Sequence, residues 1–407
     1  MKSNYKMLGK YIREVKRRNI DLKVNDLLGL STQKEFRTSI SNIIGTDLST
    51  YKIIGYNNFV YMPVTDTWKG LSVALYRNKE LKIVSQIYKV FEILDEKELD
   101  HEYLIMWFRR PEIDRYARFK SHGSAREIFD WEEMCNTLLP IPSLDKQKEI
   151  VKEYNTIVNR IALNNQLIQK LEETAQAIYK QWFVDFEFPD ENGKPYKSNG
   201  GKMEFNEEFQ MEIPKGWSFN EIKDFGKVIT GKTPSSETPD HFGNAMPFVT
   251  PGDFSQYGKF AINAERNLSE KGLNSLKNKI LSIGSVIVTC IGSDMGKVVI
   301  ASEDCITNQQ MNSIVANETY YSDYLYYKLK SIGHELKSMG MGGSTMPMLS
   351  KSEFEIVKIL KPANEILSSY HKILKPLNQR NLITSNLTNA SLQMKDLLLS
   401  KLATIEN

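Results

Sequence analysis

The sequence has little cysteine and no long apolar run. Its three cysteines, Cys135, Cys290 and Cys305, form no C-x-x-C pair and leave an odd count. This usage argues for reduced thiols in a cytoplasmic compartment, where they would serve as small buried residues. No stretch approaches the ~18 apolar residues of a membrane span. The basic start of the chain, MKSNYKMLGKYIREVKRRN, is followed by no apolar core, unlike a signal peptide. We therefore expect a cytoplasmic protein without membrane association.

The sequence also lacks the motifs of common enzymes. HExxH, GxSxG and GxGxxG are absent. The signature of adenine methyltransferases, an acidic or amide residue before two prolines and an aromatic, is missing, as is a nuclease pattern. The five histidines have no spacing that would gather a metal ion with the cysteines. We predict a binding protein without catalytic residues or a metal site.

One phosphate-binding motif is present. GKVITGKT, residues 226–233, matches G-x-x-x-x-G-K-[ST]. A true phosphate-binding loop follows a buried strand and opens into a helix. Here polar and charged residues interrupt the apolar pairs of the preceding WSFNEIKDF, and Pro234 and Pro239 follow the motif. A second proline so soon would stop a helix. The pattern favours a loop between strands, and a P-loop NTPase remains the weaker alternative.

The chain contains an internal repeat. Residues 122–142 align without gaps on 342–362, and after a four-residue slip 154–171 align on 370–387. A period of about 220 residues is too long for a solenoid. It indicates two copies of one unit, each a mixed α and β segment followed by a long helix.

The clearest helical pattern follows Pro142. Apolar residues recur at spacings of four and three from Ile150 to Trp182, interrupted only at Asn164. This period of 3.5 predicts a helix from about 145 to 183, roughly 57 Å long at ~1.5 Å per residue. A polar residue at such a seam typically fixes the register of the two helices.

A weaker seam lies near the C-terminus. It starts at Ile366, and from Ile383 it continues one residue out of phase, with Pro376 inside. We expect a kink or break at this proline. The two helices are predicted to pack against each other antiparallel as a coiled coil. The predicted seam consists of Ile150, Tyr154, Ile157, Ile161, Asn164, Ile168, Leu171, Ile178, Trp182, Tyr370, Ile373, Leu377, Leu387 and Met394.

The arrangement favours duplex DNA as the ligand. Two different domains held apart by helices would read two unlike half-sites. Basic residues interleaved with aromatics in the first domain, and Gly/Ser/Thr/Lys loops in the second, suit phosphates and base edges. The candidate DNA-binding residues are Arg13, Lys16, Arg17, Lys120, Ser124 and Arg126 in the first domain, and Lys232, Thr233, Ser235, Ser293, Lys297, Ser344 and Thr345 in the second.

Several motifs, in this order, resemble the specificity subunits of Type I restriction–modification systems. They are LPIPSLDKQ with Pro142 and Gln147, the helix end AIYKQWFVDFEF, the opening IPKGW, and Gly231 to Pro234, which falls on a Gly-x-Thr-Pro-like loop. The resemblance covers essentially the whole chain. Two departures stand out: the first domain lacks an IPKGW opening, and the C-terminal helix has no counterpart to Gln147 at its start.

The resemblance implies an α+β fold with a pseudo-twofold internal repeat. It predicts a first target-recognition domain (1–142), a central coiled-coil helix (143–185), a linker (186–210), a second target-recognition domain (211–362) and a C-terminal coiled-coil helix (363–407). Each domain would read one half of an asymmetric bipartite site, and the helices would set the spacing.

The resemblance also implies partners and cofactors. The helices would dock two methyltransferase subunits, and restriction or translocase subunits would join the complex. This chain would be non-catalytic and bind no cofactor, because S-adenosylmethionine, ATP and Mg serve the partner subunits. A non-catalytic coiled-coil scaffold with two protein-binding heads remains an alternative. It differs from DNA recognition in that it predicts no salt-dependent affinity for DNA.

Overall fold

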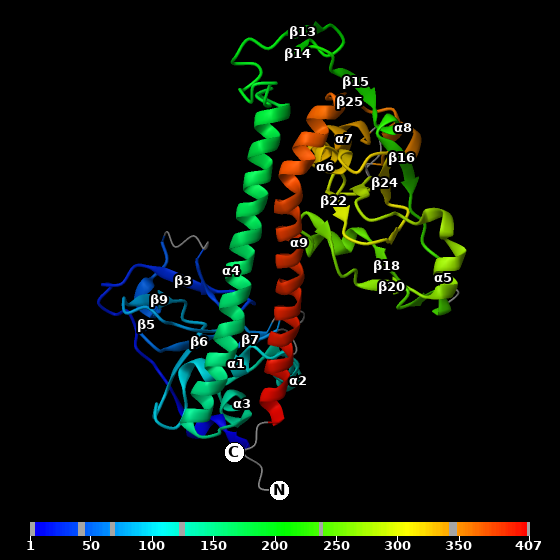
Figure 1. The fold of residues 1–407 in the computed structure, drawn as a ribbon. Coiled ribbons are helices and arrows are strands. Elements are labelled where there is room, and N and C mark those ends of the chain that lie inside the picture. Colours follow the sequence, from blue (N-terminus) through cyan, green and yellow to red (C-terminus); the bar gives the residue numbers. More distant parts are fainter. Residues whose placement is uncertain are drawn as a thin grey trace. The chain divides into compact units, whose positions relative to one another are not determined.

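The computed structural model describes residues 5–39, 45–65, 70–121, 127–235, 239–341 and 348–404. The chain divides into two compact units: Met1–Ala162 with Asn389–Asn407, and Leu163–Thr388. Two long helices, α4 (Leu144–Phe183) and α9 (Asn364–Lys401), each contribute one segment to each unit (Figure 1). Each unit therefore holds one mixed α and β domain and parts of both helices.

The domain of the first unit is built on small, mostly antiparallel sheets. A four-stranded sheet has the order β2-β10-β6-β8, and a second has the order β4-β3-β9-β5. Strand β1 pairs with β12, and β7 pairs with β11. The strands are β1 (Tyr5–Met7), β2 (Ile12–Glu14), β3 (Leu27–Leu30), β4 (Phe36–Thr38), β5 (Lys52–Ile54), β6 (Phe59–Tyr61), β7 (Val64–Thr65), β8 (Val73–Leu75), β9 (Lys82–Val84), β10 (Lys89–Ile93), β11 (Glu127–Ile128) and β12 (Leu138–Pro140); the helices before α4 are α1 (His101–Phe108), α2 (Pro111–Lys120) and α3 (Trp131–Asn136).

The domain of the second unit has a five-stranded sheet in the order β16-β24-β21-β22-β19 and a four-stranded sheet in the order β17-β20-β18-β23. Strands β13 and β14 form a hairpin, and β15 pairs with β25. The strands are β13 (Met203–Asn206), β14 (Met211–Pro214), β15 (Ser218–Glu221), β16 (Gly226–Thr230), β17 (Phe242–Gly243), β18 (Met246–Val249), β19 (Phe260–Ala261), β20 (Arg266–Leu268), β21 (Val286–Thr289), β22 (Val298–Ala301), β23 (Ile306–Thr307), β24 (Met311–Ala316) and β25 (Lys358–Lys361); the helices before α9 are α5 (Glu270–Ser275), α6 (Tyr321–Ser331), α7 (Gly333–Met339) and α8 (Lys351–Glu355).

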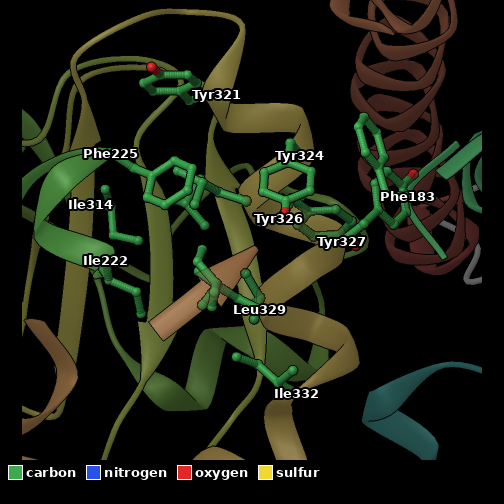
Figure 2. Close-up of a cluster of buried hydrophobic side chains, with 14 of the residues drawn as sticks. Phe183, Ile222, Phe225, Ile314, Tyr321, Tyr324, Tyr326, Tyr327, Leu329 and Ile332 are labelled. Carbon is green, nitrogen blue, oxygen red and sulfur yellow. The ribbon is translucent and has the colours of Figure 1, made fainter. Parts of the chain in front are cut away.

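Helix α6 covers the core of the second unit with aromatic side chains. Figure 2 shows Tyr324, Tyr326 and Tyr327 of α6 between Phe225 and Phe183, the last residue of α4. The ring of Tyr324 lies 4.9 Å from that of Phe183 and 6.2 Å from that of Phe225. Aromatic pairs at such distances add to the free energy of burial. This cluster joins the sheet, α6 and the helix α4 in one core.

The two domains repeat one order of elements. Near the start of each, a strand, a short 3-10 helix and a second strand follow in turn, and a strand directly before the long helix closes the domain. The Tyr103 hydroxyl donates to the carbonyl of Pro140 (2.9 Å), and the Tyr324 hydroxyl donates to the carbonyl of Leu360. Pro140 and Leu360 are equivalent positions in the gap-free alignment of the two copies. Together with the two long helices, this confirms the predicted fold class.

Contacts within each unit show that α4 and α9 are antiparallel. In the first unit, Ile150 and Tyr154 near the start of α4 share a core with Leu399 near the end of α9. In the second unit, Trp182 near the end of α4 lies 5.7 Å, ring to ring, from Tyr370 near the start of α9. All predicted seam positions of α4, Asn164 included, are buried or half-buried.

The predicted seam of α9 was partly wrong. Tyr370 is buried and Leu377 is half-buried, but Ile373, Leu387 and Met394 are 42%, 56% and 57% exposed. When the gap-free alignment is extended into the helices, the buried Gln147, Ile150 and Tyr154 fall on Leu367, Tyr370 and Leu374, which are also buried. The repeat therefore continues into the helices without the four-residue slip. The true seam of α9 continues through the buried Asn381, Thr384 and Thr388.

The expected break at Pro376 was also wrong, because α9 is continuous from Asn364 to Lys401. Pro376 lies on the exposed side of the helix, next to the exposed Lys375. A proline leaves one helical carbonyl without its donor, and water can satisfy such a group on an exposed face. No helix among the described residues is long and apolar enough to cross a membrane.

Candidate nucleic-acid interface

Several loops of the second unit meet at one end of its five-stranded sheet. The last residue of β16, Thr230, lies opposite Asn312 of β24, and the last residue of β21, Thr289, lies opposite Met311. Strands β16 and β21 therefore end, and β24 begins, at the same edge. We call this edge the loop end of the second domain. The loops at 231–235 and 290–297 leave the sheet there, and the loop at 308–310 enters it there.

The loop after β16 is built against residues 307–310. Gly231 has no room for a side chain, since an added Cβ would lie 2.2 Å from the carbonyl oxygens of Thr307 and Asn308. The amide of Lys232 donates to the carbonyl of Thr307 (2.9 Å). The Thr233 hydroxyl donates to Gln309 Oε1 (2.6 Å), while the Lys232 side chain is exposed.

The P-loop alternative is wrong on two counts. Strand β16 pairs antiparallel with β24 rather than lying in a parallel sheet. Residues 231–235, which follow the motif's strand, contain no helix. The helix N-terminus that would hold phosphates is therefore missing from this described segment. The glycine at 231 serves the close approach to Thr307 instead.

The turn between β21 and β22 presents two predicted residues. Gly292 and Gly296 have φ values of +88° and +89°, which favour glycine. Ser293 is exposed, and its carbonyl accepts from Lys337 Nζ (2.9 Å). Lys297 is also exposed and lies 2.9 Å from Asp294 Oδ1. An exposed pair of this kind contributes little stability.

Ser344 and Thr345 lie outside the described residues, but their flanks are described. Met348 pairs with Ile291, and the amide of Leu349 donates to the carbonyl of Cys290 (2.9 Å). Both contacts lie at the loop end of the second domain. Ser235 is exposed at the end of the 231–235 loop.

The first unit has an equivalent sheet edge. Glu14 ends β2 opposite Phe91, and Lys89 begins β10 opposite Tyr61, the last residue of β6. We call this edge the loop end of the first domain. The predicted residues Lys16 and Arg17 directly follow β2 there, and both side chains are exposed. Arg13, on β2 itself, is held by Glu92 (Nε–Oε1 2.6 Å).

The loop end of the first domain collects positive charge from distant parts of the chain. Arg18 forms a β-bridge with Lys52, and Lys89 Nζ lies 3.1 Å from Glu14 Oε1. Burial lowers the pKa of Lys52, and the nearby charges of Lys89, Arg18 and Lys16 lower it further while Glu14 opposes them. Sequence reasoning missed Lys52 and Lys89, because only strand pairing brings them beside Lys16.

Of the three remaining predicted residues of the first domain, Lys120 belongs to the described part of the chain. Lys120, the last residue of α2, has its Nζ 3.8 Å from Glu133 Oε2. Ser124 and Arg126 lie outside the described residues. The strand that follows them, β11, pairs with β7 next to the end of β6. No group of three or more His, Cys, Asp or Glu among the described residues could hold a metal ion.

The two loop ends correspond to each other within the repeat. The sheet orders β2-β10-β6-β8 and β16-β24-β21-β22 match strand by strand. The amide of Leu94 donates to the carbonyl of Tyr11, and the amide of Asn317 donates to that of Phe225, each at 2.8–2.9 Å. Tyr11 and Phe225 are therefore equivalent, and the same offset along the chain pairs Arg18 with Lys232. The structure thus places basic residues at the same edge of both domains.

Comparison with known proteins agrees with the repeat. The family model for the Type I restriction modification DNA specificity domain matches residues 34–173 and 214–392, once for each copy. The Type I restriction enzyme HindI specificity subunit of Haemophilus influenzae is 27% identical over 352 residues, which cover 74% of this chain and 76% of that protein. The MjaIX specificity subunit of Methanocaldococcus jannaschii is 33% identical over 190 residues, 44% of either protein.

A solved structure shares the fold over nearly the full length. The S subunit of a Type I restriction–modification system from M. genitalium superposes with a TM-score of 0.61, covering 99% of this chain and 96% of that one. The two sequences are 14% identical. At this identity the likeness speaks for the fold alone.

Proposed function

Since the chain belongs to the family of Type I restriction–modification DNA specificity subunits, which recognise DNA sequence, we propose that each of its two domains reads one half of a bipartite site. We assign the readers to residues 1–142 and 211–362. Their loop ends carry different side chains, with arginines and lysines in the first and Lys232, Thr233 and Ser235 in the second. Unlike readers imply an asymmetric site.

One observation carries this proposal: the corresponding sheet edge bears exposed basic side chains in both domains, and in the second domain also hydroxyl side chains. Lysines and arginines there would neutralise phosphates, and hydroxyl groups would reach base edges. The backbone holds both sets firmly, because they follow paired strands directly. A scaffold that binds proteins would not need positive charge at the same edge of two diverged domains.

The two long helices would set the distance between the readers and dock the partners. Four apolar residues on the outer side of α9, Ile383, Leu387, Met394 and Leu397, are each more than half exposed. They recur at spacings of four, seven and three, which is typical of a helix face that packs on another helix. In the first unit, Met394, Leu397 and Ile157 line a groove of about 680 Å³.

We assign this face to methyltransferase subunits, in keeping with the family. The chain itself would be non-catalytic and cytoplasmic, and would bind no cofactor. S-adenosylmethionine chemistry would belong to the methyltransferase subunits. ATP and Mg would serve restriction or translocase subunits. The exposed apolar face supports a protein partner, since single surface apolar residues are common but an ordered stripe is not.

The proposal is tested by mapping methylated adenine in the host at base resolution. The map is made with this gene, without it, and with residues 1–142 replaced by the same segment of a relative. Deletion should remove one split, asymmetric motif, and the replacement should change one half of it. An unchanged map on deletion, or a change in both halves on replacement, would contradict the two-reader model.

A further inference from the structure

A buried ion pair lies between the second domain and the long helices, within the second unit. Lys259, directly before β19, has its Nζ 3.2 Å from Asp323 Oδ1 on α6. Their side chains are only 1% and 4% exposed. Charges so completely removed from water are rare unless they are paired and hydrogen-bonded. The pair is not part of the loop end, so DNA recognition as described above does not account for it.

Helix α9 completes the coordination of this pair. His371 Nδ1 donates to Asp323 Oδ2 (2.7 Å), and Asn378 Nδ2 donates to Asp323 Oδ1 (2.5 Å). Lys259 Nζ in turn donates to Asn378 Oδ1 (2.8 Å). One carboxylate therefore joins the sheet, α6 and α9. Each of these hydrogen bonds is directional.

Helix α4 is attached to the same cluster from its own side. Glu172 accepts hydrogen bonds from the hydroxyl of Tyr327 (3.0 Å) and from Lys330 Nζ (3.2 Å), both on α6. The ammonium of Lys259 lies 4.7 Å from the ring centre of Tyr327, within reach of a cation–π interaction. The ring of Tyr327 thus links Glu172 of α4 to the cluster of Lys259 and Asp323 that α9 binds.

The first copy of the repeat has apolar residues at the two helix positions that bind the buried carboxylate in the second copy. The residues equivalent to His371 and Asn378 in the gap-free alignment are Val151 and Val158, which pack against the apolar core of the first unit. Buried ion pairs contribute little net stability compared with apolar packing, and their best attested benefit is a unique geometry. At His371 and Asn378, therefore, the second domain contacts α9 through directional hydrogen bonds, although apolar contacts at these positions would suffice to attach it.

We propose that Lys259, Asp323, His371, Asn378 and Glu172 are positioning residues that hold the second reader at one angle on the helices and so limit the gap between half-sites that the protein accepts. This inference rests on the proposed function. The residues act through the orientation of the domain and do not touch DNA. Apolar contacts alone would let the domain tilt, and DNA with a longer or shorter gap would then bind.

The main test puts the residues of the first copy into the second, as the double variant His371→Val/Asn378→Val. It leaves the Lys259–Asp323 pair intact but removes its bonds to α9. The specificity subunit is purified in complex with its methyltransferase partner. Affinity is measured for a duplex with the mapped site and for duplexes whose gap is one base pair longer or shorter. We expect the discrimination against the wrong gaps to fall about tenfold, equivalent to ~1.4 kcal/mol.

Two further variants separate positioning from folding. Asp253→Asn is the matched control, because Asp253 is also a buried carboxylate but accepts its hydrogen bonds from Thr250 and Glu265 of its own domain. It should weaken binding to all three duplexes equally. Glu172→Gln weakens only the contact of α4 with Tyr327 and Lys330. It should also reduce the discrimination against the wrong gaps, but by a smaller factor than the double variant.

The outcomes are distinct. Equal losses on all three duplexes for His371→Val/Asn378→Val would overturn the positioning role, as would an unchanged gap preference. If the wild-type complex does not distinguish the mapped site from a scrambled duplex, the proposed function fails and the inference fails with it. If the wild type prefers its own gap and the variant keeps that preference, only the inference is overturned.

Discussion

The two domains meet the long helices in opposite ways. In the first unit, Gln147 of α4 is fully buried: its Nε2 donates to the carbonyls of Glu98 and Pro142 (2.9 Å each), and its Oε1 accepts from the amide of Asp100 (2.8 Å). The equivalent position of the second copy is Leu367, which is also fully buried but lies in an apolar core. Near the start of the long helix, the buried contact is therefore polar in the first copy and apolar in the second.

Further along the helices the roles are exchanged. Val151 and Val158 pack on the first domain, whereas His371 and Asn378 bind a buried carboxylate of the second. Equivalent positions of the two interfaces are thus polar in one copy and apolar in the other. At these positions the two copies share burial or half-burial, whereas the chemistry of the side chain differs.

The largest effect should come from Asp323→Asn, which leaves the ammonium of Lys259 buried without its counter-ion. Removing one partner of a buried pair typically costs about 3–5 kcal/mol. We expect a loss of this size in the free energy of unfolding measured with urea at neutral pH. The variant Asp294→Asn removes the acid of an exposed pair and should change the stability by less than about 0.5 kcal/mol. Similar losses for both variants would contradict the role of burial.

At low pH the free energy of unfolding of the wild type should approach that of Asp323→Asn. Burial alone would raise the pKa of Asp323, but the hydrogen bond from His371 and the charge of Lys259 outweigh it and lower the pKa. The folded carboxyl therefore stays ionised below the ~3.9 of an ordinary Asp. Its contribution to stability is complete above that pH and is lost as the pH falls through the lowered value. Urea unfolding at pH 7, 5 and 3 measures this, and a constant difference would contradict it.

In the first unit the sharpest test is Gln147→Leu, which inserts the residue of the second copy. The amide of Asp100 and the carbonyls of Glu98 and Pro142 would lose their buried partner. Stranding buried polar groups costs about 1–3 kcal/mol. The matched control is Gln166→Leu, the same change at an exposed position of the same helix. A loss in both variants would point to the helix itself and not to the contact with the domain.

A smaller effect is expected at the loop end of the second domain. Gly231→Ala places a Cβ against the carbonyls of Thr307 and Asn308, so the loop must shift. Overpacking of this kind costs about 1–2 kcal/mol, and DNA affinity should fall with it. Gly258→Ala is the control, since a Cβ there meets nothing within 4 Å. Unchanged DNA affinity in Gly231→Ala would argue against a DNA-facing loop.

The smallest change in stability, under about 0.5 kcal/mol, is expected for Lys232→Ala, because the side chain is exposed. Its effect lies in DNA binding. The slope of log affinity against log salt should become shallower by about 0.9 if Lys232 neutralises one phosphate. Lys16→Ala in the first domain should make the slope shallower by a similar amount. Nucleotide binding by equilibrium dialysis should be absent in the wild type, and a nucleotide affinity that Lys232→Ala abolishes would revive the P-loop interpretation.

Much of the architecture could be read from the sequence. The internal repeat gave two mixed domains, and the 3.5-residue period gave the helix that runs from Leu144 to Phe183. Both signals are local or depend on comparing the chain with itself. The phase of α9 could not be read in this way, because its buried seam includes Asn381 and Thr384 while Ile383 and Leu387 face outward. A hydrophobic pattern indicates the apolar face, and in this part of α9 apolar residues also occupy the outer face.

Which charged residues meet at a loop end could also not be predicted in full from the sequence, for a different reason. The sequence identified the charged segment around Lys16 and the glycine loop at Gly231. Lys52 and Lys89 begin β5 and β10, far along the chain from Lys16. Strand pairing alone brings these lysines together.

By itself, then, the sequence determined the repeat, the first long helix and the DNA-recognising family, because periodicity and motif order are properties of neighbouring residues. The seam of α9, the lysines that join the loop end of the first domain and the buried network around Asp323 became visible only in the tertiary structure. Those features depend on which distant residues share a low-dielectric environment, and contacts between residues far apart in the chain leave no local pattern.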